Sequence, residues 1–392
     1  MATSISAALR RAPSAAPNND RVFYKYVAIA AAVLVLALAV SPPALAHHGL
    51  GRFDRTKQVD FTGVIQGIDF VNPHSYLHFD AVGADGKTIA MRCEMRAATL
   101  LRRSGWTPET FVVGAKAVVH GFAHRDDPAS CYLEDITIGD APRMNRNDQF
   151  EHTTKTDVSE RPLRLPSGEP NISGDWAQEQ YVVAVNGARL VPKSMVAAVR
   201  AGTIKPGDTP DSGWGPRPVT FTKRGKEEAD AFRMWSPEDN PRLRCRPTSI
   251  ILDWVFDGAV NRITQEKDRI VINYGLFSFE RVIHMNMAEH PANVAPSYAG
   301  HSIGRWDGDD LVVDTVGFEP GVIAAPVRNS DELHIFERFS LDPKTMALTR
   351  RYVAVDPVYF IDTYFGSDTV LVADVPYEPH PCNELTPEFR AQ

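Results

Sequence analysis

The sequence lacks the motifs that identify several common enzyme classes. It contains no P-loop, no Gly-x-Ser-x-Gly nucleophile elbow, no dinucleotide-binding fingerprint and no His-Glu-x-x-His zinc helix. It has only four cysteines, and no two of them form a Cys-x-x-Cys pair. Thiol redox catalysis and a cysteine-based structural zinc site are therefore poorly supported.

The sequence also has no excess of basic residues. The formal net charge is -7 for the whole chain. Residues 1–46 hold four basic residues and one acidic residue, a net of +3, so the rest of the chain carries -7 minus 3, or -10. An acidic chain without a basic stripe is not expected to bind nucleic acid. The 29 prolines and 26 glycines argue against long helices and favour short strands joined by turns.

One long apolar run is present, from Tyr26 to Val40, and it is shorter than the roughly 20 residues of a membrane-spanning helix. Basic residues precede this run, and Pro42-Pro43 and the small-x-small sequence Ala44-Leu45-Ala46 follow it. This order is typical of a cleaved secretory signal peptide. We predict that residues 1–46 are removed, that the protein is periplasmic or secreted, and that no stable membrane span remains. An uncleaved membrane anchor is the alternative.

The four cysteines are Cys93, Cys131, Cys245 and Cys382. An even number of cysteines in an oxidising compartment favours disulfide bonds. Two cysteines fall in each half of the chain, so the simplest pairing joins Cys93 to Cys131 and Cys245 to Cys382. Four buried thiols are the alternative.

The mature chain predicts an all-β fold in two domains. In residues 47–140, strand patterns alternate with turn signals, and a short helix is expected over residues 94–104, with Gly105 as its stop. Five or so strands with one helix indicate a small closed barrel of the OB type. The strands are expected at residues 59–68, 75–82, 87–93, 117–122 and 132–138.

A polar segment at residues 141–170 is predicted to be a linker to a larger domain at residues 171–392. Sequential strands joined by short turns favour an antiparallel meander that closes into a lipocalin-like barrel or a sandwich. The Gly174-Asp175-Trp176 sequence is reminiscent of the first strand of lipocalin-like barrels. Strands are expected at residues 268–273, 277–285, 301–318 (with a hairpin turn at Asp307-Gly308), 333–341 and 348–355.

Cleavage after Ala46 would place His47 and His48 at the start of the mature chain. The terminal amine and the imidazole Nδ1 of His47 can chelate one ion, and a further imidazole gives a three-nitrogen donor set that suits Cu(II). Histidines four residues apart on one strand, such as His74 and His78, lie about 13 Å apart and cannot share that ion. We predict a copper site at His47, His48 and His74. A solvated chain end is the alternative.

Several motifs in the predicted first domain resemble those of a family of secreted bacterial proteins of unknown function. They are His47-His48-Gly49, Phe53-Asp54, the strand Phe61-Thr62-Gly63-Val64, Asn72-Pro73-His74 and the run from Leu100 to Trp106. The resemblance covers residues 46–140. It implies export and a shared role for His47 and His74, and it implies no activity.

The larger domain resembles a second group of secreted bacterial proteins of unknown function, through the run Gly300–Trp306 and the strand Leu311–Thr315 that follows it. Its strands also carry polar residues between apolar ones. A buried glutamate with a raised pKa beside a histidine can act as general acid and base in hydration, dehydration or isomerisation. The candidate catalytic residues are Glu280, His284, His301, Asp314 and Glu337. The alternative is cross-strand ion pairs on a solvated face, such as Arg281 with Glu337.

These patterns favour an exported two-domain β protein that binds a small apolar molecule, with a copper site at the mature N-terminus. One alternative is a periplasmic enzyme that uses acid–base chemistry on an apolar small molecule in the larger domain. The other is a structural or partner-binding envelope protein. The sequence leaves open whether the protein is an enzyme.

Overall fold

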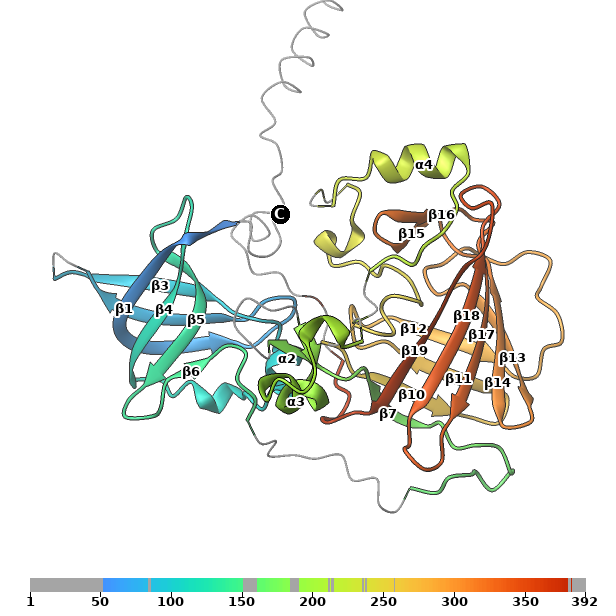
Figure 1. Ribbon diagram of the computed structural model, residues 1–392, viewed down its shortest axis with the longest axis horizontal. Helices are drawn as coiled ribbons and strands as arrows, with labels where there is room; N and C mark the ends of the chain where they lie inside the picture. The colour runs from blue at the N-terminus through green and yellow to red at the C-terminus, as the bar shows by residue number, and fades with distance from the viewer. Residues whose placement is uncertain are drawn as a thin grey trace, which may run out of the picture. The chain divides into compact units, whose positions relative to one another are not determined.

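The computed structural model describes the chain from Arg52 to Cys382, with short gaps. Contacts group Ala46–Gln392 into one compact unit. Most of the regular structure is strand, and the all-β prediction is confirmed (Figure 1). The described residues are 52–83, 86–150, 161–183, 190–210, 212, 215–234, 236, 238–256, 258–379 and 382.

The first sheet is built from the N-terminal strands. Its order is β3-β2-β1-β4-β5-β6, and an additional parallel pairing joins β3 to β5. That pairing closes five strands into a ring and leaves β6 beside β5, as expected for a small OB-like barrel. The strands are β1 (Phe53–Asp69), β2 (Tyr76–Val82), β3 (Thr88–Glu94), β4 (Lys116–His124), β5 (Ser130–Ile138) and β6 (Met144–Asn145). The last of these lies in the segment that was predicted to be a linker.

One α-helix, α2 (Ala98–Arg103), lies between β3 and β4 in the chain. It is shorter than the predicted helix because Glu94 is the last residue of β3. Gly105 follows with a positive φ of 81° and its N–H donates to the carbonyl of Arg102, so its role as the helix stop is confirmed. Leu101 and Trp106 pack into the core of the ring, together with residues of β1 to β5.

The second sheet is a closed barrel of nine strands in the order β10-β11-β12-β13-β14-β17-β18-β19-β7. Its strands are β7 (Gly174–Ala177), β10 (Asn261–Gln265), β11 (Arg269–Asn273), β12 (Glu280–His284), β13 (His301–Asp307), β14 (Asp310–Val316), β17 (His334–Leu341), β18 (Leu348–Val355) and β19 (Tyr364–Val372). Trp176 is fully buried in its core and its indole N–H donates to the carbonyl of Ile172 at 2.8 Å.

Smaller elements accompany the barrel. Two hairpins are formed by β8 (Tyr181–Val183) with β9 (Leu190–Pro192) and by β15 (Gly321–Ala324) with β16 (Val327–Asn329). The helices are α3 (Val196–Arg200) and α4 (Lys223–Asp230), with 3-10 turns η2 (Pro108–Thr110), η3 (Lys193–Met195), η4 (Pro206–Asp208) and η5 (Pro241–Arg244).

The barrel is not the simple antiparallel meander that the sequence favoured. β12 and β13 run parallel, with Ile283 opposite Ser302 and His284 opposite Ile303. A parallel pair cannot be joined by a tight turn, because the chain must return to the start of the next strand. Residues 285–300 make this return. The Asp307-Gly308 hairpin between β13 and β14 is confirmed.

Charged side chains occupy part of the barrel interior. Arg281, Glu337 and Arg350 are at most 2% exposed, and Glu337 accepts hydrogen bonds from both arginines. Arg350 also donates to Asp368 at 2.7 Å and to the carbonyls of Ile250 and Ile251. The predicted pairing of Arg281 with Glu337 is therefore present, but it lies inside the barrel and not on a solvated face.

Both predicted disulfides are present. Cys93 pairs with Cys131, and these residues face each other across the β3–β5 pairing that closes the first ring. Cys245 follows η5 and pairs with Cys382 near the C-terminus. Two disulfides indicate an oxidising, extracytoplasmic environment. In the described part of the chain no helix is long and apolar enough to cross a membrane.

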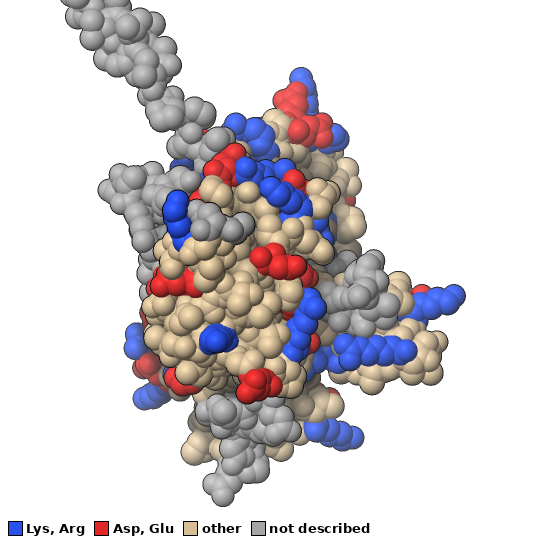
Figure 2. Space-filling model, turned by 90° about the vertical axis from the view of Figure 1, so that its left-hand side faces the viewer, with Lys and Arg blue, Asp and Glu red and all other residues tan. Residues whose placement is uncertain are grey.

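One face of the molecule shows how its charges are distributed. On that face Lys and Arg lie interspersed with Asp and Glu among uncharged residues (Figure 2). Neither sign forms a continuous surface in this view.

Candidate functional site: a cavity beside the β1–β2 loop

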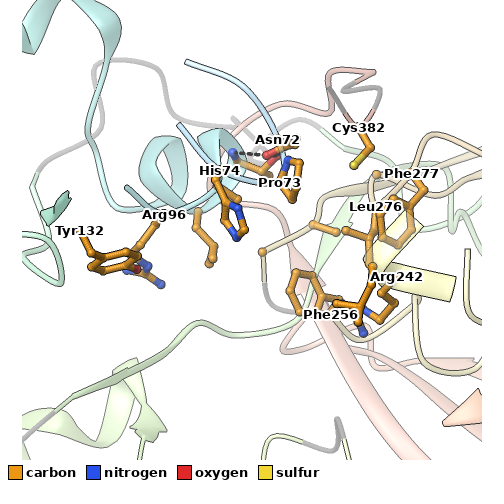
Figure 3. A pocket seen from close by; sticks show the side chains of 17 residues that line it. Asn72, Pro73, His74, Arg96, Tyr132, Arg242, Phe256, Leu276, Phe277 and Cys382 are labelled. Carbon is orange, nitrogen blue, oxygen red and sulfur yellow. Dashed lines mark hydrogen bonds between the residues drawn. The ribbon is translucent and has the colours of Figure 1, made fainter. Parts of the chain in front are cut away.

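A cavity of about 360 Å³ lies beside the loop that joins β1 to β2. Pockets that hold small molecules typically enclose about 300–1,000 Å³, with mostly apolar walls and a few polar groups. This cavity fits that description (Figure 3). Its walls are formed by Asn72, Pro73, His74, Arg96, Ala97, Thr99, Leu100, Tyr132, Arg242, Leu243, Phe256, Gly258, Ala259, Gly275, Leu276, Phe277 and Cys382.

The β1–β2 loop is held in place by the start of α2. The Asn72 side chain accepts a hydrogen bond from the Thr99 N–H at 3.2 Å and donates to the Thr99 hydroxyl at 3.0 Å. The N–H of Ala98 donates to the carbonyl of Val71. The Asn72–Pro73 peptide bond is cis. These contacts fix the loop on α2 and place His74 in the cavity wall.

His74 lies between two groups of side chains in the cavity. Arg96 and Tyr132 are on one side of its ring, and Phe256 and Leu276 are on the other (Figure 3). Its Nδ1 is 3.5 Å from a carboxylate oxygen of the buried Glu94. Burial raises the pKa of Tyr132, so that phenol stays neutral.

The opposite wall of the cavity is formed by segments that connect the barrel strands, including η5 and the β11–β12 turn. Asn240 accepts a hydrogen bond from the Arg242 N–H and so caps the 3-10 turn that carries Arg242 and Leu243. The Arg242 guanidinium lies 4.4 Å from the centre of the Phe256 ring, within cation–π distance.

The β11–β12 turn completes this wall with an unusual backbone. Phe277 and Ser278 both have positive φ angles, 60° and 52°. This conformation is uncommon for residues other than glycine and, where it occurs, it often lies at a ligand site. Gly275 precedes them, and any Cβ at that position would meet the carbonyl oxygen of Val260. The turn therefore needs glycine at 275 to bring Phe277 to the cavity.

The C-terminal segment is anchored beside the cavity by α2 and by a disulfide. Arg103 is 3% exposed and donates to Asp374 at 2.8 Å and to the carbonyl of Gln178 at 2.9 Å. Arg102 pairs with Glu378. Cys382 lines the cavity and forms a disulfide bond with Cys245. Its backbone also forms an isolated parallel β-bridge with Asn72.

The walls therefore combine apolar surface with cationic groups. Phe256, Leu276 and Phe277 offer an apolar surface, while Arg96 and Arg242 are cations that remain protonated at any physiological pH. Arginine in a partly desolvated site binds carboxylate, phosphate or sulfonate groups with two parallel hydrogen bonds. The cavity is chemically suited to a molecule with an apolar body and one anionic group.

The predicted metal ligands are only partly described. His74 lies in the cavity wall, whereas His47 and His48 lie outside the described residues. Within the described ranges, no group of three or more His, Cys, Asp or Glu side chains is arranged to hold a metal ion. A copper site at His74 therefore depends on donors from residues that are not described.

The predicted catalytic residues do not form a single site. Glu337 faces the barrel interior, where it pairs with Arg281 and Arg350. Glu280 is exposed on the outer face and accepts a hydrogen bond from the Asn273 amide at 3.2 Å. The interior position of Glu337 separates it from the histidines, because alternate residues of a strand face opposite sides.

The other three predicted residues do gather on the outer face of the barrel. The rings of His284 and His301 stack with their centres 4.9 Å apart. Asp314 accepts a hydrogen bond from His334, and its Oδ1 lies 3.4 Å from Nε2 of His290. His290 and His334 were not among the predicted site residues.

Sequence reasoning missed most of the cavity for an identifiable reason. Arg96, Arg242 and Phe256 lie in short connecting segments, where no periodic pattern marks a functional face. The exception is His74, which was predicted as a copper ligand and lies in the cavity wall. His290 and His334 join the outer cluster only because β12 and β13 are parallel and β17 follows β14 in the sheet.

Comparison with known families identifies only the N-terminal part. Residues 34–131 match the model of a family of unknown function, DUF6152. The match is about a quarter of the chain and ends in β5, so it includes the β1–β2 loop and α2 but none of the large barrel. It supports resemblance to an uncharacterised family and assigns no activity. No curated protein and no solved structure matches the chain.

Proposed function

We propose that the protein is an exported binding protein whose cavity beside the β1–β2 loop holds a small molecule with an apolar body and an anionic group. The observation that carries this proposal is the pairing of two cations, Arg96 and Arg242, with aromatic and aliphatic walls in one cavity of about 360 Å³. The buried charged residues inside the large barrel support the same choice, because they occupy space that a barrel ligand would need.

Export remains part of this proposal. It is supported by the two disulfides and by the order of basic, apolar and small residues before His47. A periplasmic or secreted binding protein would meet its ligand outside the cytoplasm.

The fluorescent probe 1-anilinonaphthalene-8-sulfonate tests the ligand class, because it combines aromatic rings with one sulfonate. We expect the exported protein to bind the probe and Arg242→Gln to weaken binding about tenfold, the loss typical of a charge-assisted hydrogen bond. Arg351→Gln is the matched control, because Arg351 is an exposed arginine on β18. Equal affinity in all three proteins would exclude an anion site at Arg242.

A second proposal concerns copper and rests on His74. This histidine is held in the cavity wall on a loop fixed by α2, which is the kind of rigid placement a metal ligand requires. We propose that the mature terminus at His47 supplies the amine and imidazole and that His74 supplies a third nitrogen to Cu(II), with His48 adjacent.

Copper titration of three proteins separates this site from a solvated terminus. We expect the native-terminus protein to bind about one equivalent on this one-site arrangement, with affinity falling at low pH as the nitrogen donors protonate. One residue added before His47 and, separately, His74→Ala should each weaken binding. Unchanged copper affinity in both variants would remove His47 and His74 from the site, without affecting the anion proposal.

A further inference from the structure

We propose that residues 285–300 form a pH-sensitive latch on the large barrel, closed by neutral histidines and opened when they are protonated. This segment, called the latch below, connects β12 to β13. It is the crossover that the parallel pairing of these strands requires.

His290 is the side chain by which the latch contacts the histidine cluster of the barrel. Its Nδ1 lies 2.9 Å from Nδ1 of His301, at the start of β13. Its Nε2 lies 3.4 Å from Oδ1 of Asp314 on β14. The two imidazole rings meet edge to face, with their centres 5.1 Å apart. Because His290 is only 17% exposed, these contacts are shielded from water.

The contact between His290 and His301 requires a particular protonation state. A hydrogen bond between two ring nitrogens needs a proton on one and a lone pair on the other. If both rings are doubly protonated, each nitrogen carries a hydrogen and both rings carry a positive charge. At 2.9 Å the attraction is then replaced by a steric and electrostatic repulsion.

The neighbouring histidines strengthen this dependence. His284 stacks on His301, so a positive charge on His284 disfavours protonation of His301. Burial, followed by His284 and His290, lowers the pKa of His301 below its usual range. His334 donates to Asp314, so the carboxylate nearest to the cluster is already shared between two histidines.

Most other charged side chains near the histidine cluster form ion pairs or hydrogen bonds with residues outside the cluster. Arg269 on β11, opposite His284, pairs with Glu266, and Arg338 on β17 pairs with Asp307 and Asp310. Glu280 on β12 accepts from Asn273. The remaining charged groups on these elements are Glu289 in the latch, the exposed Arg305 on β13, and Arg281 and Glu337, which pair with each other inside the barrel. Protonation of several histidines therefore adds positive charge beside one shared carboxylate.

The latch is also attached at both ends: the Met285 N–H donates to the carbonyl of Asp268 at 2.8 Å, and Met285 packs against the barrel core. Further contacts lie near its C-terminal end. The Ser297 N–H donates to the carbonyl of Gly317 at 3.1 Å, and the Glu319 N–H donates to the carbonyl of Ser297 at 3.0 Å. Val294 packs where a Cβ at Gly317 would lie, so Gly317, with φ 73°, lets the latch approach closely. Opening at His290 would loosen these contacts beside the buried Phe318.

The direction of the pH dependence follows from the lowered pKa of His301. A histidine that stays neutral in the closed state favours that state above its ordinary pKa of about 6.5. As pH falls from about 6.5 towards the lower pKa of the closed state, the open state binds more protons and becomes favoured. The latch is therefore closed at neutral pH and open in acid.

Hydrogen exchange of the exported protein, followed by mass spectrometry at pH 7.5 and 5.5, tests the latch. Exchange times are rescaled for the intrinsic pH dependence of amide exchange. After that correction, we expect peptides from residues 285–300 and 317–319 to exchange faster at pH 5.5. The gain is about tenfold per pH unit between the ordinary pKa of about 6.5 and the lower pKa of the closed state if opening takes up one proton. Peptides from β17 and β18 should be unchanged.

Two variants decide whether the histidines are responsible. His290→Gln and His301→Gln keep a polar side chain that cannot become charged. We expect both to remove the acid-induced change, whether the latch is then permanently closed or permanently open. His120→Gln is the control, because His120 pairs with Asp60 in the first sheet. Persistence of the full acid effect in both variants, or its absence in the unmodified protein, would overturn the proposal.

Discussion

At the residue scale, the most consequential side chain of the large barrel is Arg281. It is fully buried and donates to Ser302 at 2.9 Å, to Thr315 at 2.9 Å and to Glu337. Its position on β12 opposite the outward-facing Glu280 and Val282 follows from strand alternation. A buried ion pair of this kind stabilises the fold only while both partners are present, because a buried charge without its partner is strongly destabilising.

Removing Arg281 should therefore be costly. We expect Arg281→Met to lower the free energy of unfolding by about 3 kcal/mol, because Glu337 keeps only Arg350 as a cationic partner. The matched substitution Arg338→Met, on the outer face of β17, should cost less than about 1 kcal/mol, as exposed ion pairs do. Urea unfolding of both variants measures the difference, and equal losses would contradict a special role for the interior network.

Asp253 gives a second prediction, through pH. It is fully buried, its Oδ2 accepts from the Thr248 N–H at 2.7 Å, and its Oδ1 has no hydrogen-bond partner among the described residues. Burial raises its pKa to about 6. A carboxyl with a raised folded-state pKa favours folding while it is protonated, and this contribution is lost as pH rises through about 6.

Asp253→Asn should remove that pH dependence, because the amide is neutral at every pH. Unfolding free energies at pH 5 and pH 7.5 provide the measurement. We expect the stability of Asp253→Asn relative to the unmodified protein to increase by about 1.4 kcal/mol between the two pH values, because only about one pH unit of this interval lies below the folded-state pKa. If the two proteins keep a constant difference in stability, the buried carboxyl does not titrate in this range.

At the element scale, the two disulfides have separable consequences. The Cys93–Cys131 bond joins β3 to β5 and closes the first ring, and neither of these cysteines lines the cavity. The Cys245–Cys382 bond ties the C-terminal segment to η5, and Cys382 itself lines the cavity. The Cys93–Cys131 disulfide therefore stabilises the first ring, whereas the Cys245–Cys382 disulfide also holds part of the cavity wall in place.

Replacing each pair by alanine tests this division. We expect Cys245→Ala with Cys382→Ala to weaken binding of the sulfonate probe several-fold, because the cavity loses a fixed wall. Cys93→Ala with Cys131→Ala should lower the unfolding free energy by about 2–4 kcal/mol while leaving probe affinity near its normal value. The opposite pattern, with affinity lost only in the Cys93 and Cys131 variant, would place the ligand elsewhere.

At the scale of the whole molecule, the prediction concerns the mature chain. The sequence before His47 predicts cleavage after Ala46, and the copper proposal depends on that cut. N-terminal sequencing of the protein recovered from the periplasm should therefore begin at His47. A chain that retains Met1, or that starts well away from His47, would remove the terminal amine from the proposed copper site.

Local sequence was sufficient for the elements that repeat with a short period. The alternation along β2, β13 and β14 predicted strands within a residue or two of their observed ends, and Gly105 predicted the end of α2. The pairing of the four cysteines was also predictable, because each pair lies within one half of the chain. These features depend on neighbours in sequence or on simple proximity along the chain.

Contacts between distant segments were decided only by the tertiary structure. The parallel pairing of β12 with β13 has no local signal, and it alone places His290 beside His301. The sequence did not predict that Glu337 lies inside the barrel. Alternation along a strand assigns residues to two faces, but it does not show which face is enclosed. The cavity unites His74, Arg96 and Arg242, which are far apart in sequence, through packing of connecting segments. Sequence therefore determined many of the strands, their alternating faces and the cysteine pairs, although β10 and β19 were not predicted. The fold decided which polar residues meet, because that depends on how the sheets close.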